Sequence, residues 1–491
     1  MSDNIWPIMN NISRKVVSNL IWRFAERCGA QLVAFVVSVV LARILDPDAY
    51  GTVALITVFT AILQVFVDSG LGNALIQKQN ADDVDFSTVF YTNILFCTVL
   101  YGILFAASPL IAAFYGQPEI TPYVRVLGLT VLISGIKNVQ QAYVSRHLLF
   151  KRFFFSTLGG TLAAAVIAIA MALNGFGIWA LVAQQVINLS IDTIILWITV
   201  KWRPKPVFSF KRLKSLFSYG WKLLVSSLLN TVYGNLWQLI IGKVYSSADL
   251  AYYNKGDNLP YQIVVNIDSS IDSVLLPTLS NVQDERDRVR QMTRRAIQTG
   301  IYVMAPLMMG MAFCAEPIVE LLYTEKWLGC VPYIRIFRIT YMFYPIHTAN
   351  LNAIKAMGRS DIFLKLEIIK KCVGLVILLF TMPYGVMAMA YGMLLSSFLS
   401  QIINSWPNRR LLHYSYFDQL KDILPGILLS VGMGFCVYGI GLALQNLVPL
   451  LLILLIQILT GAIIFIVGSH LLRLDSFEYL WNMMKELLHR H

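Results

Sequence analysis

Residues 447–471 read LVPLLLILLIQILTGAIIFIVGSHL, a stretch without a single Asp, Glu, Lys or Arg. A helix of this length and composition spans the hydrocarbon core of a bilayer, which is about 30 Å thick. Similar apolar runs recur from about residue 20 to about residue 472. Of the 491 residues, 57% are hydrophobic and 13% are charged, whereas soluble domains carry about 25% charged residues. The chain is therefore predicted to be an all-α integral membrane protein without a separate soluble domain.

Turn sequences, such as Asn-Gly at 174–175 and Met-Pro-Tyr-Gly at 382–385, separate the apolar runs. Between these breaks the hydropathy predicts about fourteen transmembrane helices. We place them at 19–44, 51–76, 86–113, 122–145, 153–173, 176–199, 213–242, 250–279, 290–315, 331–354, 361–381, 385–405, 423–443 and 447–471.

Basic residues are distributed unevenly between the predicted loops. Almost all loop Lys and Arg lie in one set of alternate loops, and the other set holds only Lys243 and Lys326. Cytoplasmic loops of membrane proteins carry the excess of Lys and Arg. The asymmetry therefore predicts that both termini are cytoplasmic. It also accounts for the net charge of +12 without a nucleic-acid partner.

The two halves of the chain resemble each other. Residues 107–115 read ASPLIAAFY and residues 315–323 read AEPIVELLY, while PYVRV at 122–126 matches PYIRI at 332–336. The offset covers six predicted helices, so both halves have the same orientation in the membrane. Parallel repeats of this kind are typical of transporters that rock two bundles around a central site. We predict a first bundle at 1–200, a second at 201–410, and two additional helices with a tail at 411–491.

Four basic residues lie inside predicted spans, at one level of the cytoplasmic leaflet. At 1.5 Å per residue, they lie roughly 6 to 13 Å from the cytoplasmic helix ends. Intramembrane charges are functional candidates by default, and these four predict a cationic chamber for an anionic head group. The alternative interpretation is snorkelling to the interface together with pairing to Glu26. The four residues are Arg23, Arg27, Lys137 and Lys222.

Acidic residues inside predicted spans are candidates for ion coupling. An intramembrane carboxylate can carry a coupling proton or sodium ion, but it can equally form a structural pair with Lys or Arg. Asp268 and Asp272 are four residues apart and share one helix face. The candidates are Glu26, Asp68, Asp192, Asp268 and Asp272.

Polar side chains recur at helical spacing in several predicted spans. They could line a wet cavity for sugar hydroxyls, or they could form hydrogen bonds between helices. Both interpretations stay open. The glycan-facing candidates are Asn188, Asn230, Gln238, Gln262, Asn266 and Tyr344.

The sequence contains no P-loop, hydrolase elbow, dinucleotide fingerprint or metal-ligand motif. No catalytic residue, metal or cofactor is therefore expected beyond a coupling ion. Cys314 and Cys330 flank one predicted outer loop, where a disulfide is conceivable, but buried free thiols are favoured.

Four stretches carry a family resemblance. They are LARILDPDAYG at 41–51, FVDSGLGNALIQ at 66–77, ADLAYYNKGDNLP at 248–260 and KAMGRSDIFLK at 355–365. Together they resemble the signature of bacterial polysaccharide-export flippases of the Wzx type, in the multidrug/oligosaccharidyl-lipid/polysaccharide exporter superfamily. The similarity extends over essentially all predicted helices and is greatest to the group used for colanic acid and other exopolysaccharides.

The resemblance implies a MATE-like fold in the bacterial inner membrane and a transporter rather than an enzyme. It also implies that undecaprenyl-pyrophosphate-linked oligosaccharide repeat units are moved from the cytoplasmic to the periplasmic leaflet by alternating access. This step would serve lipopolysaccharide or exopolysaccharide biosynthesis. The resemblance also implies a cationic cavity, and the four basic residues lie at a membrane depth that suits such a cavity. Expected partners are the lipid-linked substrate, membrane lipids, and polysaccharide polymerase and chain-length proteins.

Three other functions compete with this interpretation. A cation-coupled multidrug antiporter of the same fold should have an acidic central cavity, which the four basic residues disfavour. A flippase for the peptidoglycan lipid precursor would need similar charges. A membrane-embedded glycan polymerase or glycosyltransferase would need a large extramembrane catalytic loop, and the loops here are too short.

Overall fold

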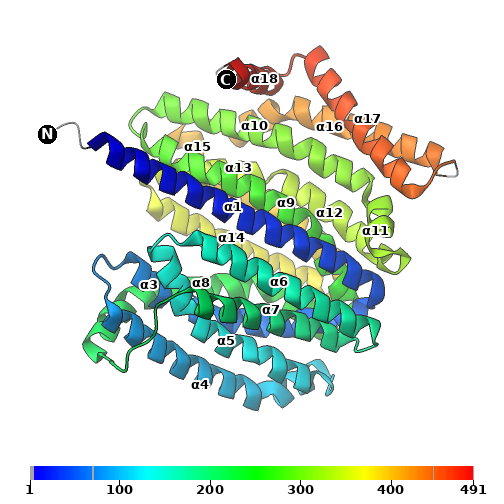
Figure 1. Ribbon diagram of the computed structural model, residues 1–491. Helices are drawn as coiled ribbons and strands as arrows, with labels where there is room; N and C mark the ends of the chain where they lie inside the picture. Colours follow the sequence, from blue (N-terminus) through cyan, green and yellow to red (C-terminus); the bar gives the residue numbers. More distant parts are fainter. Residues whose placement is uncertain (1–4, 69–70, 446, 490–491) are drawn as a thin grey trace. The chain divides into compact units, whose positions relative to one another are not determined.

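A computed structural model describes residues 5–68, 71–445 and 447–489. Within that range the side chains of residues 5–21, Arg23, Phe24, Arg27, Tyr219 and 487–489 lie outside the description. All regular structure in the described range is helical, and Figure 1 labels the helices along the chain.

The N-terminal helices are α1 (Ile5–Ile44), α2 (Pro47–Asp68), α3 (Leu71–Gln77), α4 (Asp83–Tyr115), α5 (Ile120–Arg146), α6 (Phe150–Leu173), α7 (Ile178–Thr199) and α8 (Phe210–Val244). The chain continues with α9 (Ser247–Ser280), α10 (Arg286–Phe313), α11 (Ala315–Tyr323), η1 (Glu325–Cys330), α12 (Val331–Met342), α13 (Tyr344–Ala356) and α14 (Ser360–Thr381). It ends with η2 (Met382–Tyr384), α15 (Val386–Leu411), α16 (Tyr416–Leu444), α17 (Leu450–Leu471) and α18 (Asp475–His489).

Every predicted span overlaps a helix; the second span covers parts of both α2 and α3, and the tenth span is divided into α12 and α13. In the described part of the chain, 9 helices are long and apolar enough to cross a membrane by length and composition. The remaining spans are α1, α8, α9, α14 and the α12–α13 pair. Helix α1 is apolar over Cys28–Ile44, and α12 and α13 are each shorter than 18 residues. Helices α8, α9 and α14 carry charged and polar residues that lower their mean hydropathy. The predicted all-α membrane fold is confirmed.

Local turn chemistry sets several helix ends. The Asp82 side chain accepts hydrogen bonds from the backbone N–H groups of Val84 and Asp85, and the Asp85 side chain accepts from the Asp82 N–H. This capping box begins α4. Gly116 ends α4 in the left-handed conformation, with φ 68°, a backbone geometry that favours glycine.

The chain divides into two compact units, Met1–Leu250 and Ala251–His491. In the first unit, α5 packs against α2, α4 and α7, and α6 packs against α1 and α7. Helix α8, which the sequence places at the start of the second bundle, packs against α2, α3 and α4. In the second unit, α10 packs against α12, α13 and α16. The bundle limits at residues 200 and 410 describe the sequence repeat and stay a prediction.

The repeated segments make equivalent contacts in the two units. In the first unit, Arg125 Nε donates to Ser108 Oγ at 2.9 Å. In the second, Arg335 Nη2 lies 3.7 Å from Glu316 Oε2. Both pairs join the arginine of the PY(V/I)R(V/I) segment to the residue before the proline of the preceding segment. The sequence similarity therefore reflects one packing arrangement used in each unit.

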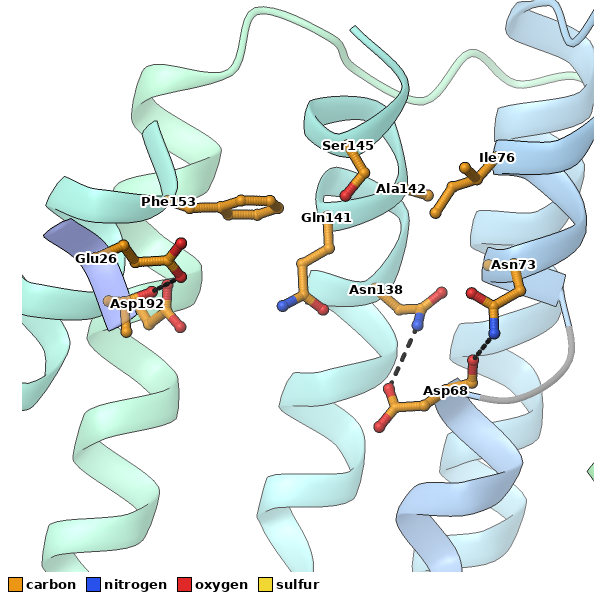
Figure 2. A pocket seen from close by; sticks show the side chains of 12 residues that line it. Glu26, Asp68, Asn73, Ile76, Asn138, Gln141, Ala142, Ser145, Phe153 and Asp192 are labelled. Atoms are coloured by element: carbon orange, nitrogen blue, oxygen red, sulfur yellow. Dashed lines mark hydrogen bonds between the residues drawn. The ribbon is translucent and has the colours of Figure 1, made fainter. Parts of the chain in front are cut away.

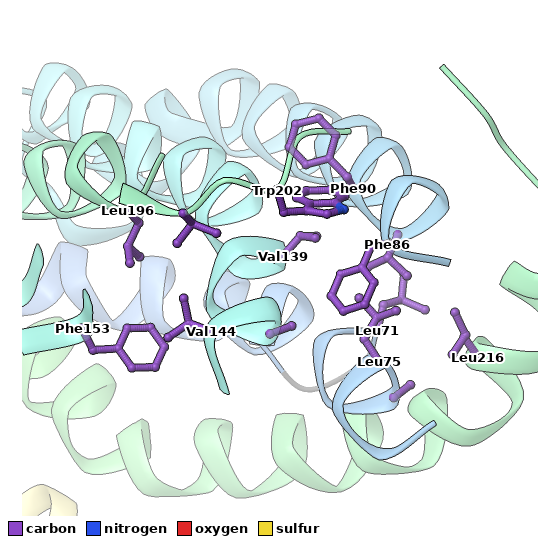
Figure 3. Close-up of a cluster of buried hydrophobic side chains, with 14 residues drawn as sticks. Leu71, Leu75, Phe86, Phe90, Val139, Val144, Phe153, Leu196, Trp202 and Leu216 are labelled. Carbon is purple, nitrogen blue, oxygen red and sulfur yellow. The ribbon is translucent and has the colours of Figure 1, made fainter. Parts of the chain in front are cut away.

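A buried apolar cluster fixes the connection between α7 and α8 to the first unit (Figure 3). The Trp202 ring contacts Phe86 at a centroid distance of 5.7 Å, and its Nε1 donates to Asp83 Oδ1 at 3.2 Å. The Trp202 carbonyl accepts from Gln140 Nε2 at 3.2 Å. Trp202 is thus held by both an apolar pocket and two hydrogen bonds.

An ion pair reinforces this attachment at the start of α8. Arg212 binds Asp82 and also lies 3.4 Å from Asp85 Oδ2. Its hydrogen bond lowers the pKa of Asp82 to about 2, so the pair keeps its charges throughout the physiological pH range. The connection therefore anchors the first turn of α8 to α4.

We expect Trp202→Ala to destabilise the protein by about 3–5 kcal/mol, because it removes a large buried ring and leaves a cavity. The measurement is thermal unfolding of the purified protein in detergent. Phe208→Ala is the matched control, because Phe208 belongs to the same connection but is 45% exposed. Equal shifts in the two variants would show that the connection is not anchored through Trp202.

Candidate functional site

A cavity of about 400 Å³ lies among α1, α2, α3, α5, α6 and α7 of the first unit (Figure 2). Three carboxylates that the sequence nominates for ion coupling converge on it, although they come from helices far apart in the chain. Amide and hydroxyl groups complete its polar lining. The polar lining includes Glu26, Asp68, Asn138, Gln141, Thr157 and Asp192.

Lys137 and Asp192 form an ion pair at the edge of this cavity. The distance between Lys137 Nζ and Asp192 Oδ2 is 2.5 Å, and the side chains are only 12% and 9% exposed. Breaking such a buried pair by removing one partner leaves an uncompensated charge. The second oxygen of Asp192, Oδ1, has no hydrogen-bond partner in the described part of the chain. The charge of Lys137 is therefore compensated by a partner on α7, and Asp192 retains one buried oxygen that accepts no hydrogen bond from the described residues.

Asp68 ends α2 and lines the opposite side of the cavity. It accepts hydrogen bonds from Gln64 Nε2 at 3.1 Å and from Asn138 Nδ2 at 3.5 Å. Asn138 also accepts from Asn93 Nδ2 at 3.3 Å. A Cβ at Gly72 would lie 2.5 Å from Asn138 Oδ1, so glycine at this position leaves room for the Asn138 amide that bonds to Asp68. The segment FVDSGLGNALIQ thus has a physical role, since it supplies both the carboxylate and the glycine beside it.

Glu26 approaches the cavity from α1. Its Oε1 accepts from Thr157 Oγ1 of α6 at 3.3 Å. Arg23 and Arg27 flank Glu26 on the same helix, but their side chains lie outside the described residues. Their predicted place in a cationic chamber stays a prediction.

The second unit repeats this arrangement with different chemistry. The offset that superimposes PYVRV on PYIRI carries Lys137 onto His347 and Asn138 onto Thr348. His347 Nδ1 lies 3.0 Å from Asn404 Nδ2 of α15. Because the amide nitrogen is a donor, Nδ1 is assigned as the acceptor. A neutral pair therefore takes the place of the Lys137–Asp192 ion pair.

The carboxylates of α9 also bond to the equivalent helix of the second unit. Thr348 Oγ1 donates to Asp268 Oδ1, and Asn352 Nδ2 donates to Asp272 Oδ1 at 2.8 Å. In both units an aspartate of one helix accepts a hydrogen bond from a polar side chain of a helix later in the chain, as Asp68 of α2 does from Asn138 of α5. All five acidic candidates therefore accept at least one hydrogen bond, and three of them share a single cavity.

The remaining basic candidate, Lys222, is exposed on α8. Unlike Lys137, it forms no ion pair with any residue that the structure describes. No described contact joins the two lysines. Lys137 thus has a charged partner, whereas Lys222 has none among the described residues. Their similar predicted depth in the membrane did not reveal this difference.

The glycan-facing candidates fall into two environments. Asn188 and Gln238 are half-buried, and the Asn188 backbone packs so tightly on Gly160 that a Cβ there would lie 2.6 Å from its oxygen. Tyr344 is also half-buried, with its ring 5.8 Å from those of Tyr341 and His347. Three other candidates are exposed, namely Asn230, Gln262 and Asn266. The half-buried group fits packing between helices, and the exposed group is accessible to a ligand.

An ion pair within α14 is not among the predicted site residues. Lys370 Nζ lies 2.5 Å from Glu367 Oε1, with side chains 15% and 30% exposed. At 1.5 Å per residue, Lys370 lies about 15 Å from the start of the helix. The signal was available in KLEIIKK at 365–371, because charged residues in a predicted span are functional candidates. Glu367 and Lys370 therefore join the candidate site residues of the second unit.

Among the described residues, no cluster of three His, Cys, Asp or Glu side chains could hold a metal ion. All six cysteines are free thiols, and Cys314 and Cys330 are both buried.

The family model described as polysaccharide biosynthesis protein matches residues 40–332, more than half of the chain. This chain belongs to the polysaccharide biosynthesis protein family. The match covers the cavity helices α2 to α7 and most of the second copy of the repeat. The resemblance to Wzx-type polysaccharide-export proteins is thereby confirmed.

Two relatives share much of the length of this polysaccharide biosynthesis protein. The teichuronic acid biosynthesis protein TuaB of Bacillus subtilis is 25% identical over 451 residues, which is 89% of this chain and 91% of the relative. The succinoglycan biosynthesis transport protein ExoT of Rhizobium meliloti is 26% identical over 337 residues, 68% of this chain and 67% of the relative. One name refers to the biosynthesis of teichuronic acid, and the other refers to transport in the biosynthesis of succinoglycan.

Solved structures show the same fold. The lipid II flippase MurJ in an inward closed conformation has a TM-score of 0.72 at 15% identity, covering 93% of this chain and 99% of that one. An inward-facing multidrug transporter of the MATE family has a TM-score of 0.62 at 14% identity, covering 78% and 94%. The predicted MATE-like membrane fold is confirmed.

Proposed function

We propose that this protein is a flippase that moves undecaprenyl-pyrophosphate-linked oligosaccharide repeat units from the cytoplasmic to the periplasmic leaflet. It would act by alternating access in the bacterial inner membrane, with both termini in the cytoplasm, and would supply lipopolysaccharide or exopolysaccharide synthesis. The observation that carries the proposal is the family match over residues 40–332, in a chain whose membrane helices enclose a polar, charged cavity.

The ligand has three chemical parts, and the chain offers a partner for each. The pyrophosphate would bind Arg23, Arg27, Lys137 and Lys222. Sugar hydroxyls would bind the polar candidates, Asn188, Asn230, Gln238, Gln262, Asn266 and Tyr344. The polyprenyl chain would stay in the surrounding lipid. On the periplasmic side the repeat unit would pass to the polymerase and chain-length proteins.

The Lys137–Asp192 pair suggests how ion coupling and substrate binding could be linked. A proton or sodium ion at Asp192 would neutralise the carboxylate and make the Lys137 charge available to the pyrophosphate. Loss of that ion would restore the 2.5 Å pair and displace the substrate. Glu26 and Asp68 share the cavity and would accept the same ion, while Asp268 and Asp272 would act at the equivalent place in the second unit. No other cofactor is proposed.

One observation favours a second function. The cavity of the first unit is lined by three carboxylates, Glu26, Asp68 and Asp192, which suits a cationic drug better than a pyrophosphate. A multidrug antiporter with the fold of the MATE transporter therefore stands as the alternative. The peptidoglycan lipid precursor is a third possible cargo, because MurJ has the same fold.

The deciding experiment uses cells that lack this protein. We expect complete undecaprenyl-pyrophosphate oligosaccharides to accumulate on the cytoplasmic face, read by mass spectrometry with a leaflet-access assay. The accumulated species would also identify the sugar. Unchanged lipid-linked sugars, together with raised sensitivity to cationic drugs, would instead establish the antiporter. Accumulation of the peptidoglycan precursor would establish the third cargo.

A further inference from the structure

The second unit contains a cavity that the proposed transport reaction does not use. It has a volume of about 910 Å³ and lies among α10, α16, α17 and the start of α18. Its walls are mostly apolar. Two glycines also line it, Gly426 and Gly432, and a Cβ at either position would meet no atom within 4 Å. The apolar wall residues are Leu424, Leu428, Leu429, Met433 and Ile464.

The mouth of this cavity is basic. Lys421 near the start of α16 and Arg473 just after α17 line it, and both side chains are exposed. Neither forms an ion pair within the described part of the chain. A neighbouring cavity of about 420 Å³ brings Arg294 and Arg295 to the same region. Two cationic side chains thus line this cavity, and two others line the neighbouring one.

Two acidic residues also line the cavity, but both lie near a cation. Asp422 Oδ1 accepts from Arg294 Nη2 at 2.6 Å, and Asp422 Oδ2 accepts from the Tyr414 hydroxyl at 2.7 Å. Asp475 lies close enough to Arg294 to interact with it electrostatically. Asp418 also lies close enough to Lys421 to interact with it electrostatically. Lys421 and Arg473 nevertheless form no ion pair with the described residues, so both charges can bind a ligand at the mouth.

The mouth of the cavity lies at the predicted level of the cytoplasmic membrane surface. It lies where α16 begins, at Tyr416, and where α17 ends, at Leu471. The distribution of loop charges predicts that these ends are cytoplasmic. Helix α18 follows at once and exposes Trp481 and Met484, 45% and 49% accessible, as expected of a helix lying in the interface. The basic mouth is then at head-group level, and the apolar body lies deeper in the leaflet.

We propose that this cavity binds an anionic phospholipid of the cytoplasmic leaflet. The lipid phosphate would contact Lys421 and Arg473, and an acyl chain would run along α16 and α17. Basic pockets between transmembrane helices on the cytoplasmic side bind anionic head groups in this manner. The cavity volume falls within the range of about 300–1,000 Å³ typical of ligand sites. The site is independent of the transported substrate and of the cavity in the first unit.

The test uses the full chain, purified in detergent and supplied with phosphatidylglycerol or phosphatidylcholine. Native mass spectrometry counts the bound lipids. We expect retention of phosphatidylglycerol and loss of phosphatidylcholine by the unaltered protein. In the double variant Lys421→Gln/Arg473→Gln, phosphatidylglycerol should bind roughly 30-fold more weakly. The reason is that each basic residue near an anionic head group contributes a similar share of the binding free energy, and the variant loses two of them. Arg409→Gln/Arg410→Gln is the matched control, because both residues are exposed on the same predicted side, and it should retain the lipid.

Three results would overturn the proposal. The first is equal retention of the two phospholipids by the unaltered protein. The second is unchanged phosphatidylglycerol binding in the Lys421→Gln/Arg473→Gln variant. The third is preferential retention of undecaprenyl phosphate over phosphatidylglycerol, which would assign the cavity to the lipid carrier. If the double variant does not fold, the comparison of lipids on the unaltered protein decides alone. None of these readouts depends on transport.

Discussion

Lys137→Met should abolish polysaccharide export and reduce the amount of protein in the membrane. The substitution leaves Asp192 as a buried carboxylate without its 2.5 Å partner, and removing one member of a buried ion pair costs about 3–5 kcal/mol. Asp192→Asn should reduce abundance in the same way, because it leaves Lys137 unpaired. Export is read by quantifying surface polysaccharide, and abundance by immunoblotting of membranes.

The double variant Lys137→Met/Asp192→Asn separates structure from function. Replacing both members of a buried pair by neutral groups is often close to neutral for stability, so abundance should recover. Export should remain lost, because no cation is left at this position for the pyrophosphate. Normal export by the double variant would show that the pair serves only to hold α5 against α7.

Lys222→Ala should abolish export without changing membrane abundance. Lys222 is exposed and forms no ion pair with the described residues, so its removal leaves no buried charge behind. If Lys222 binds the pyrophosphate, losing this charge should weaken substrate binding, because the anion loses one of its charged partners. Lys222→Arg, which keeps the charge, should retain most of the export.

Lys214→Ala is the matched control for Lys222, since it removes an exposed lysine of the same helix about two turns away. It should export normally. Arg27→Ala is expected to behave like Lys222→Ala, on the basis of its predicted depth in the membrane. If Lys222→Ala and Arg27→Ala both export at the unaltered rate, the cationic chamber is wrong, and the family assignment is unaffected.

Comparison of the two repeated units indicates whether the Lys137–Asp192 pair has a structural or a functional role. One unit carries a buried ion pair, Lys137–Asp192, and the other carries the neutral pair His347–Asn404 at the corresponding place. A structural requirement of the repeat would be expected in both units. The charged version in only one of them is therefore the better candidate for substrate binding and coupling.

Much of the fold followed from the sequence because its signals are local. Hydropathy reports the length of each span, and turn sequences such as Asn-Gly at 174–175 mark where helices stop, since α6 ends at Leu173. The repeat was visible because Arg125 and Arg335 occupy matching segments. Even the approximate depth of Lys137 and Lys222 could be calculated, since the rise per residue of a helix is constant.

Tertiary structure decided which of these residues meet. Lys137 and Asp192 are 55 positions apart, and Asp68 and Asn138 are 70 apart, so no local pattern joins them. Their contacts depend on how each helix is rotated about its axis, and that rotation is set by packing, as where Gly72 leaves room for the Asn138 amide. The same physics places α8 against α2, α3 and α4. The sequence by itself thus determined the membrane class, the spans and the repeat, because each can be identified from contiguous stretches of residues. Only packing between helices decided which charges are paired and which stay available to a ligand.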